Sequence, residues 1–320
     1  MNTIPLIFNE KQINRTILGG HEKLPPKLPF SVVLLNKSGR TFREKNLKML
    51  LGLGFTDIIS IEDSGVSYGI KDLSEKFPMV KFVIPGEQIT SGEMINYGME
   101  IAKNQKVLVI WDTMIMSYNL FSEKIIDFLK NIDSICIVPF LFNSKMQNIP
   151  SKTVPTMENK TLLVQSYVVT KSNVKTLYPF DFVGLYDKEK LMNIGGFDFT
   201  ITSDYWQLLD FALRANLWGE KFIVSNYLKI SYECDISPED TTLDSSYLRF
   251  FLKNLAPRFE NDRAYIHKRE FIPYLNRSSL SFFDAYKTFK LARNWVDKNK
   301  YRFKTDAETL IASWDEENDQ

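Results

Sequence analysis

Acidic and amide side chains stand directly after three short apolar runs of the sequence. Glu62 and Asp63 follow one run, Asp112 follows a second, and Asn36 closes a third. Carboxylate oxygens bind divalent cations, and in open α/β sheets ligands bind where strands reach their carboxyl ends. Taken singly, each of these residues could be a helix cap or a solvated turn. Taken together, they predict a binding site at one edge of a sheet.

Short apolar runs alternate with helical patterns through the first two thirds of the chain. The predicted strands are Ser31–Asn36, Asp57–Ile61, Val80–Ile84, Lys106–Trp111, Ser134–Phe140 and Phe182–Tyr186. Helical spacing of apolar residues recurs in Ser91–Lys103 and Tyr205–Asn216. This alternation predicts an α/β fold with a mostly parallel sheet flanked by helices.

The composition excludes several classes of protein. The 320 residues are 44% hydrophobic and 25% charged, and 40 Lys+Arg against 39 Asp+Glu give a net charge of +1. A disordered chain would be less apolar and more highly charged, and a near-neutral chain has no general attraction to nucleic acid. Cys136 and Cys234 are too few for a disulfide scaffold or a zinc site. No run resembles a signal peptide or approaches the roughly 20 apolar residues of a membrane span, so we expect a cytoplasmic protein.

The last third of the chain is basic and rich in aromatic residues. Residues 249–304 hold 14 Lys/Arg and 5 Asp/Glu. We interpret this segment as a helical appendage that packs against the α/β core or forms a dimer interface. Contact with anionic lipid at the inner face of the membrane or with a lipid-linked acceptor, and nucleic-acid binding, are the alternatives, and no recognised motif supports the last. The expected divisions are an irregular segment over 1–29, the α/β domain over 30–244, and a helical basic extension with an acidic tail over 245–320.

The ordered set of segments resembles the GT-A glycosyltransferases of the large family-2-like group. The segments that carry the resemblance, over residues 30–219, are SVVLLN, DIISIEDSG, MINYGMEIAKNQKVLVIWDTM, VGLYDKEKLMNIGGFD and LLDFALRANLWG. The resemblance implies a nucleotide-diphospho-sugar transferase fold. It also implies inverting transfer of a sugar from a nucleoside diphosphate sugar to a hydroxyl on a polysaccharide, a lipopolysaccharide or another lipid-linked acceptor, or a protein.

The resemblance also assigns roles to individual residues. The positions that match nucleotide-sugar-binding residues are Leu35, Asn36, Glu62, Asp63, Asn96 and Asp112. Among them, Glu62 and Asp63 match the acid pair that contacts the base and ribose. Asp112 matches the first acid of a motif that holds Mg²⁺ or Mn²⁺, which neutralises the leaving diphosphate.

The metal motif departs from the family pattern. Thr113 and Met114 stand where a second carboxylate normally binds the cation, and methionine is a poor ligand for a hard cation. One carboxylate together with substrate phosphates could still bind Mg²⁺, and metal-free binding of the phosphates by Lys or Arg is the alternative.

The general-base motif departs as well. The position of the family's base falls on Leu208, which cannot take a proton. Asp204 lies one helical turn earlier and is the first candidate base, with helix capping as the alternative. Asp210 matches another acid of the pattern and is the second candidate, although its spacing from Arg214 also suits an ion pair.

These departures leave two competing hypotheses beside the glycosyltransferase. Thr113, Met114 and Leu208 favour a non-catalytic GT-A-fold protein that binds nucleotide sugars or acts as a scaffold. A nucleotidyltransferase is disfavoured, because no Gly-rich phosphate loop with a following Lys or Arg appears near the first predicted strand.

Overall fold

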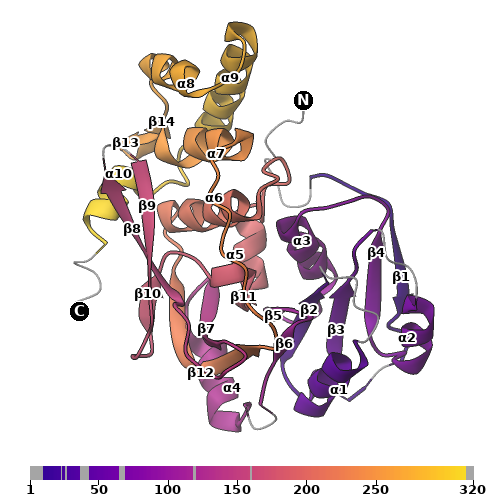
Figure 1. Ribbon diagram of the computed structural model, residues 1–320. Coiled ribbons are helices and arrows are strands. Elements are labelled where there is room, and N and C mark those ends of the chain that lie inside the picture. Colours follow the sequence, from indigo (N-terminus) through magenta and orange to yellow (C-terminus); the bar gives the residue numbers. More distant parts are fainter. Residues whose placement is uncertain are drawn as a thin grey trace.

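A computed structural model describes residues 10–22, 24–25, 27–36, 43–64, 69–117, 120–158 and 161–314. Its centre is a ten-stranded mixed sheet with the order β1-β4-β3-β2-β5-β11-β7-β12-β10, in which β6 pairs with β12 (Figure 1). The predicted α/β fold with a sheet flanked by helices is confirmed. Residues 1–9 and the acidic tail at 315–320 lie outside the described part of the chain.

The first half of the sheet contains its longest parallel block. These strands are β2 (Phe30–Leu35), β3 (Asp57–Ile61), β4 (Lys81–Pro85) and β5 (Lys106–Trp111). All residues of β2, β3 and β5 are buried, as expected for parallel strands covered on both faces. Because β2 lies between β3 and β5, the residues that follow these three strands emerge at the same edge.

The edge of this block is a strand that the sequence did not predict. The N-terminal segment, expected to be irregular, contains β1 (Arg15–Gly19), which pairs antiparallel with β4. None of its five residues is fully buried. The apolar pattern is therefore too weak to identify the strand without its partner.

The second half of the sheet mixes strand directions. Its strands are β6 (Met114–Ile115), β7 (Cys136–Phe142), β10 (Val174–Thr176), β11 (Gly184–Asp187) and β12 (Phe222–Tyr232). Strand β11 inserts antiparallel between β5 and β7, whereas β7 and β12 are parallel. A separate hairpin joins β8 (Lys152–Glu158) to β9 (Thr161–Tyr167).

Helices connect and cover these strands. They are α1 (Glu44–Leu53), α2 (Ile70–Lys76), α3 (Ser91–Ile101), α4 (Glu123–Asn131), α5 (Lys188–Asn193) and α6 (Asp204–Leu217). Helix α3 packs on β2 and β3 and also contacts α6. A capping box of Thr90 and Glu93 fixes where α3 begins, because each side chain accepts a hydrogen bond from the other residue's backbone N–H.

The C-terminal segment is mainly helical and packs on α6. Its elements are α7 (Ser245–Phe250), the π-helical turn η2 (Phe251–Leu255), β13 (Arg258–Glu260), β14 (Arg263–Tyr265), the 3₁₀ turn η3 (Lys268–Glu270), α8 (Phe271–Arg277), α9 (Phe282–Asn299) and α10 (Ala307–Ala312). Figure 1 shows α7 beside α6, with α8 and α9 projecting beyond them at one end of the molecule. Within the described residues, no helix is both long and apolar enough to cross a membrane.

Candidate functional site

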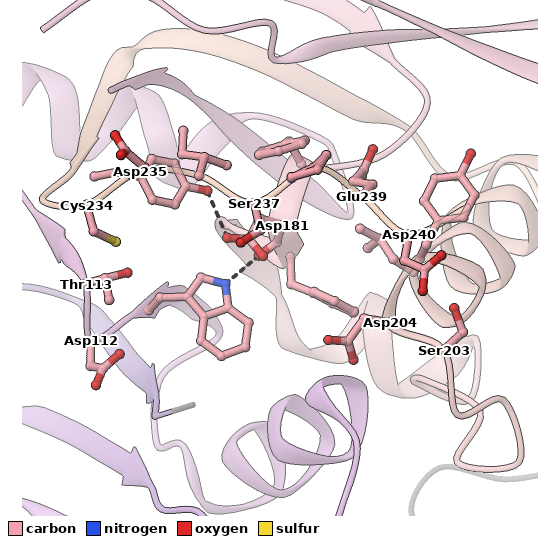
Figure 2. Close-up of a pocket in the computed structure, with 18 of the residues that line it drawn as sticks. Asp112, Thr113, Asp181, Ser203, Asp204, Cys234, Asp235, Ser237, Glu239 and Asp240 are labelled. Atoms are coloured by element: carbon pink, nitrogen blue, oxygen red, sulfur yellow. Dashed lines mark hydrogen bonds between the residues drawn. The ribbon is translucent and has the colours of Figure 1, made fainter. Parts of the chain in front are cut away.

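Two cavities adjoin at the edge where β2, β3 and β5 end. The first, of about 580 Å³, is here called the strand-end cavity, and its lining includes Lys11, Asn36, Glu62, Asp63, Thr202 and Asp204. The second, of about 720 Å³, is called the acidic cavity after its carboxylates, which are Asp112, Asp181, Asp204, Asp235, Glu239, Asp240 and Asp244 (Figure 2). Thr202 and Asp204 line both. The two cavities therefore meet at the start of α6.

Buried polar groups form the floor of the strand-end cavity. The Asn36 side-chain amide donates to Ser60 Oγ and to the Ile61 carbonyl, at 2.9 Å each. Ser60 Oγ in turn donates to Glu62 Oε1 at 2.7 Å, and Arg43 forms an ion pair with the same carboxylate. Asn36 and Glu62 thus hold the ends of β2 and β3 in register. The carboxylate of Asp63 is partly exposed and can reach a ligand.

Arg43 lies among the acids that follow β3 and β5. Burial lowers the pKa of its guanidinium, while the nearby Asp112 carboxylate acts in the opposite direction. The Asp112 backbone N–H donates to the Leu35 carbonyl at 3.0 Å, and its own carbonyl accepts from the Asn46 side chain. Arg43 was not predicted from the sequence, because an arginine just before a helix is usually exposed and nothing in the sequence indicates its burial.

The residues present do not fit a metal ion held by protein side chains. Among the described residues, no three His, Cys, Asp or Glu side chains gather closely enough to bind one. Met114, at a position where the family pattern has a second carboxylate, is fully buried in the core as part of β6. The expected Mg²⁺ or Mn²⁺ site therefore has Asp112 alone from this motif.

The loop that follows β12 supplies most carboxylates of the acidic cavity. Residues 233–244 contain five acids and no Lys or Arg, a signal that the sequence interpretation did not use. Burial raises the pKa of Glu239 to about 7, and the charge of Asp181 adds to the shift. The Tyr178 hydroxyl donates a hydrogen bond to Glu239 Oε2 at 2.8 Å, and this bond acts to lower the pKa. A carboxyl group with this pKa exchanges protons near neutral pH.

Asp181 occupies a strained turn in the wall of the acidic cavity. Asp181 and the following Phe182 have φ values of 52° and 63°, in the left-handed region that bulky side chains rarely adopt. Trp111 Nε1 donates to the Asp181 carbonyl at 2.8 Å, and the Tyr232 hydroxyl donates to its carboxylate at 3.0 Å (Figure 2). These contacts hold a backbone conformation that costs on the order of 1–3 kcal/mol per residue.

Asp204 is the first residue of α6. The cap of this helix is Ser203, whose Oγ accepts from the Trp206 N–H, so the structure does not support Asp204 as the cap. Leu208, one turn further on, lines the acidic cavity with an apolar side chain.

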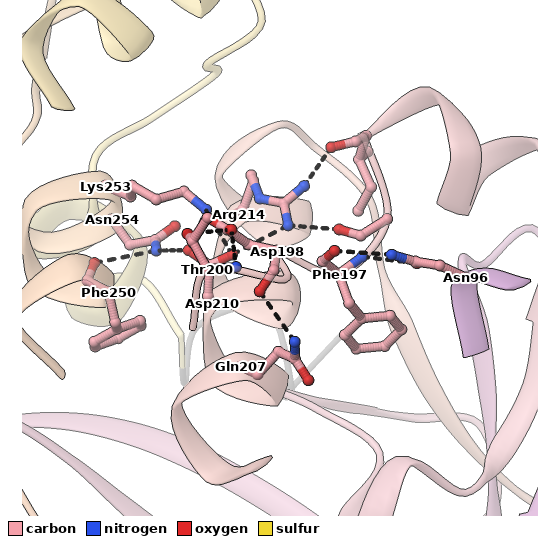
Figure 3. A network of polar contacts seen from close by, with 12 residues as sticks. Asn96, Phe197, Asp198, Thr200, Gln207, Asp210, Arg214, Phe250, Lys253 and Asn254 are labelled. Carbon is pink, nitrogen blue, oxygen red and sulfur yellow. Dashed lines mark hydrogen bonds and ion pairs between the residues drawn. The ribbon is translucent and has the colours of Figure 1, made fainter. Parts of the chain in front are cut away.

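Asp210 lies in a buried network behind the site (Figure 3). Its carboxylate accepts from Lys253 and from the Asn254 side chain, at 2.8 Å each, and from Arg214 at 3.1 Å. Burial acts to raise its pKa, but Lys253 and Arg214 outweigh burial and lower it. Asp210 is in the lining of neither cavity. This setting favours the ion-pair interpretation over a catalytic role.

Asn96 and Leu35 support the site from behind. The Asn96 side chain donates to the Phe197 carbonyl at 2.8 Å and accepts from the Phe197 N–H at 3.0 Å, which ties α3 to the turn containing Gly195 and Gly196 (Figure 3). Both glycines have positive φ values. Asn96 and Leu35 are buried and line neither cavity, so their predicted contact with the nucleotide stays a prediction.

Comparison with known proteins identifies the fold. No family model and no curated protein matches the sequence. The chain resembles a crystal structure of GalNAc-T7 with UDP, GalNAc and Mn²⁺, with a TM-score of 0.62 and 11% identity, over 92% of this chain and 59% of that one. It also matches S. aureus TarS 1-349 in complex with UDP-GlcNAc, with a TM-score of 0.48 and 13% identity, over 90% of this chain and 92% of that one. The likeness to GalNAc-T7, together with the strand order, shows that this chain has the GT-A fold of glycosyltransferases.

Proposed function

We propose that the protein is a glycosyltransferase that moves a sugar from a nucleoside diphosphate sugar to a hydroxyl group of a glycan, a lipid-linked acceptor or a protein. The observation that carries the proposal is the position of Asp204, whose side chain belongs to both cavities. A transferase needs a donor site and an acceptor site that meet at the reacting carbon, with a proton acceptor at that point.

The strand-end cavity is the proposed donor site. Its volume of about 580 Å³ falls within the range of small-molecule sites. Asp63 is the proposed partner of the base and ribose, and Asn36 and Glu62 keep the surrounding strand ends in place. Among the described residues that line this cavity, the basic side chain is that of Lys11. Its ammonium group forms ion pairs with the carboxylates of Glu87 and Glu93, at 2.7 and 3.0 Å. A bound diphosphate would compete with these acids for its charge.

The acidic cavity is the proposed acceptor site. The acceptor oxygen forms a bond to the anomeric carbon as the bond from that carbon to the diphosphate oxygen breaks, and Asp204 takes the acceptor proton. Attack from the side opposite the diphosphate inverts the anomeric configuration. Positive charge develops on the sugar ring in this step, and the carboxylates of the acidic cavity stabilise it.

Replacement of Asp204 tests the proposal. We expect Asp204→Asn to lower transfer from UDP, GDP or dTDP sugars by roughly 100-fold or more, the usual effect of losing a general base. Nucleotide-induced thermal stabilisation should remain in this variant. Asp297→Asn is the matched control, because Asp297 is an exposed acid of α9 that lines neither cavity. Full transfer by Asp204→Asn would show that Asp204 is not the base.

A nucleotide-sugar-binding protein without activity is the second candidate. The apolar Leu208 in the acidic cavity and the buried Met114 favour it, since both occupy positions where the family pattern has acids. Stabilisation of the wild-type protein by a nucleotide sugar, with neither transfer nor hydrolysis, would support this candidate.

A further inference from the structure

Large apolar side chains gather on the surface where α8 leads into α9. We call this surface the α8–α9 tip, and its members are Ile272, Leu280, Phe282, Phe283 and Tyr286. All are exposed, and Phe283 most of all, with 82% of its surface accessible. Isolated apolar residues are ordinary on protein surfaces, but a contiguous exposed group marks a contact with another surface.

The rings of the tip form one continuous surface. The half-buried ring of Phe271 lies 5.4 Å from that of Phe282 and 5.8 Å from that of Tyr286, measured between centroids. Phe282 and Phe283 lie 5.9 Å apart. All three pairs meet edge to face, which is a favourable arrangement of aromatic rings.

The helical hairpin also has a buried interior of its own. Its interior is formed by Tyr274 of α8 with Ala285 and Phe289 of α9, all of them buried. The Ser281 side chain caps α9 by accepting from the Asp284 N–H at 3.3 Å. The tip is therefore a firmly held surface whose apolar side chains remain available for a partner.

Basic side chains surround the tip. Exposed Lys and Arg residues at this end of α8 and α9 are Lys268, Arg269, Arg277, Lys287 and Lys290, and Asp284 is an exposed acid beside them. Aromatic side chains bordered by basic ones are typical of surfaces that bind anionic lipid, where rings enter the headgroup region and cations contact phosphates.

The location of the tip leaves the proposed site accessible. Figure 1 shows α8 and α9 projecting from one end of the molecule, beyond α6 and α7. No residue of α8 or α9 lines the strand-end cavity or the acidic cavity. We propose that the α8–α9 tip docks the protein on the surface of an anionic lipid bilayer, with Phe282 and Phe283 entering the interface and Lys287 and Lys290 contacting headgroups.

Vesicle binding by the full chain tests this inference. We expect sedimentation with vesicles of phosphatidylcholine and phosphatidylglycerol at low salt, none with phosphatidylcholine alone, and loss of binding as salt shortens the Debye length below ~10 Å. Phe282→Ser with Phe283→Ser should weaken binding on the order of tenfold or more, because the apolar area that enters the interface is lost. Lys287→Glu with Lys290→Glu should weaken it at low salt while keeping the rings.

A matched control shows whether vesicle binding depends on the aromatic residues of the tip or on any exposed aromatic residue. Tyr301 is 72% exposed and lies beyond the far end of α9, whose 18 residues span about 27 Å. Tyr301→Ser should bind vesicles as the wild type does. Unchanged melting temperatures and unchanged nucleotide affinity in all variants would show that fold and donor site are intact.

Two results would overturn the inference. One is failure of the wild type to sediment with anionic vesicles at low salt. The other is unaltered vesicle binding by the Phe282/Phe283 double variant. A loss of dimers in that variant, measured by light scattering and without any vesicle binding by the wild type, would assign the tip to contact between two copies of the chain instead. None of these outcomes depends on transferase activity.

Discussion

The buried Lys253 gives the sharpest test of how the C-terminal segment is joined to the GT-A fold. Only 1% of its surface is exposed, and its ammonium group lies 2.7 Å from Asp198 and 2.8 Å from Asp210 (Figure 3). Lys253 belongs to η2, whereas Asp198 follows the turn at Gly195 and Gly196 and Asp210 belongs to α6. Lys253→Met keeps most of the side-chain volume but removes the charge shared by the two carboxylates.

The loss of stability in Lys253→Met depends on the partners that Asp198 and Asp210 keep. Removing one member of a buried ion pair typically costs about 3–5 kcal/mol, because the other charge stays buried without its counterion. Asp210 would keep Arg214 at 3.1 Å and Asn254 at 2.8 Å, so we expect the lower end, about 3 kcal/mol. For a chain of 320 residues, that corresponds to a fall in melting temperature of roughly 4–5 °C.

Thermal unfolding of matched variants measures this effect. Lys298→Met removes an exposed lysine of α9 and should leave the melting temperature within about 1 °C of wild type. Adding Asp210→Asn to Lys253→Met removes one of the stranded carboxylates, so the double variant should be less destabilised than the sum of the single variants. A melting temperature for Lys253→Met equal to that of the control, or strict additivity in the double variant, would refute this reasoning.

Three further predictions concern the core and the cavities. Because the pKa of Glu239 is raised from 4.5 to about 7, the stability that its protonated form contributes is complete below pH 4.5 and is lost as pH rises through 7. The melting temperature of Glu239→Gln should therefore rise progressively above that of wild type between about pH 5 and 8, and the difference in stability should be at most about 3 kcal/mol. Melting temperatures of wild type and Glu239→Gln that change equally with pH would contradict this prediction. Gly98→Ala should destabilise by about 1–3 kcal/mol in denaturant titrations despite the better helix propensity of alanine, because the new methyl would lie 2.5 Å from Val33 Cγ2. Val33→Ala should relieve that clash, and no relief would show that the contact is not the cause. Asp63→Ala should weaken nucleotide affinity, measured by calorimetry, without lowering the melting temperature, and unchanged affinity would remove Asp63 from the donor site.

The strands nearest the site could be predicted from the sequence because they are buried on both faces. The run Lys106–Trp111 is a strand with the predicted bounds, and the predicted runs at 31–36 and 80–84 are each displaced by one residue. Continuous β-branched runs of this kind identify a strand without knowledge of its neighbours. The insertion of β11 between β5 and β7 could not be predicted, because pairing between distant strands leaves no local pattern.

The site could be predicted in outline but not in detail. The acids at the strand ends line two adjoining cavities with Asp204, as the general rule for open α/β sheets implies. Arg43 and Glu239 acquire their importance from burial beside other charges, which the order of residues does not reveal. Asp210 shows the converse, since its match to a functional motif gave no sign that Lys253 would bury it in an ion pair.

A structure of the protein with a bound nucleoside diphosphate sugar tests the central claim most directly. The account predicts the base and ribose in the strand-end cavity beside Asp63, with the anomeric carbon facing Asp204 and the acidic cavity. A donor bound at another place, or one whose anomeric carbon points away from Asp204, would contradict it.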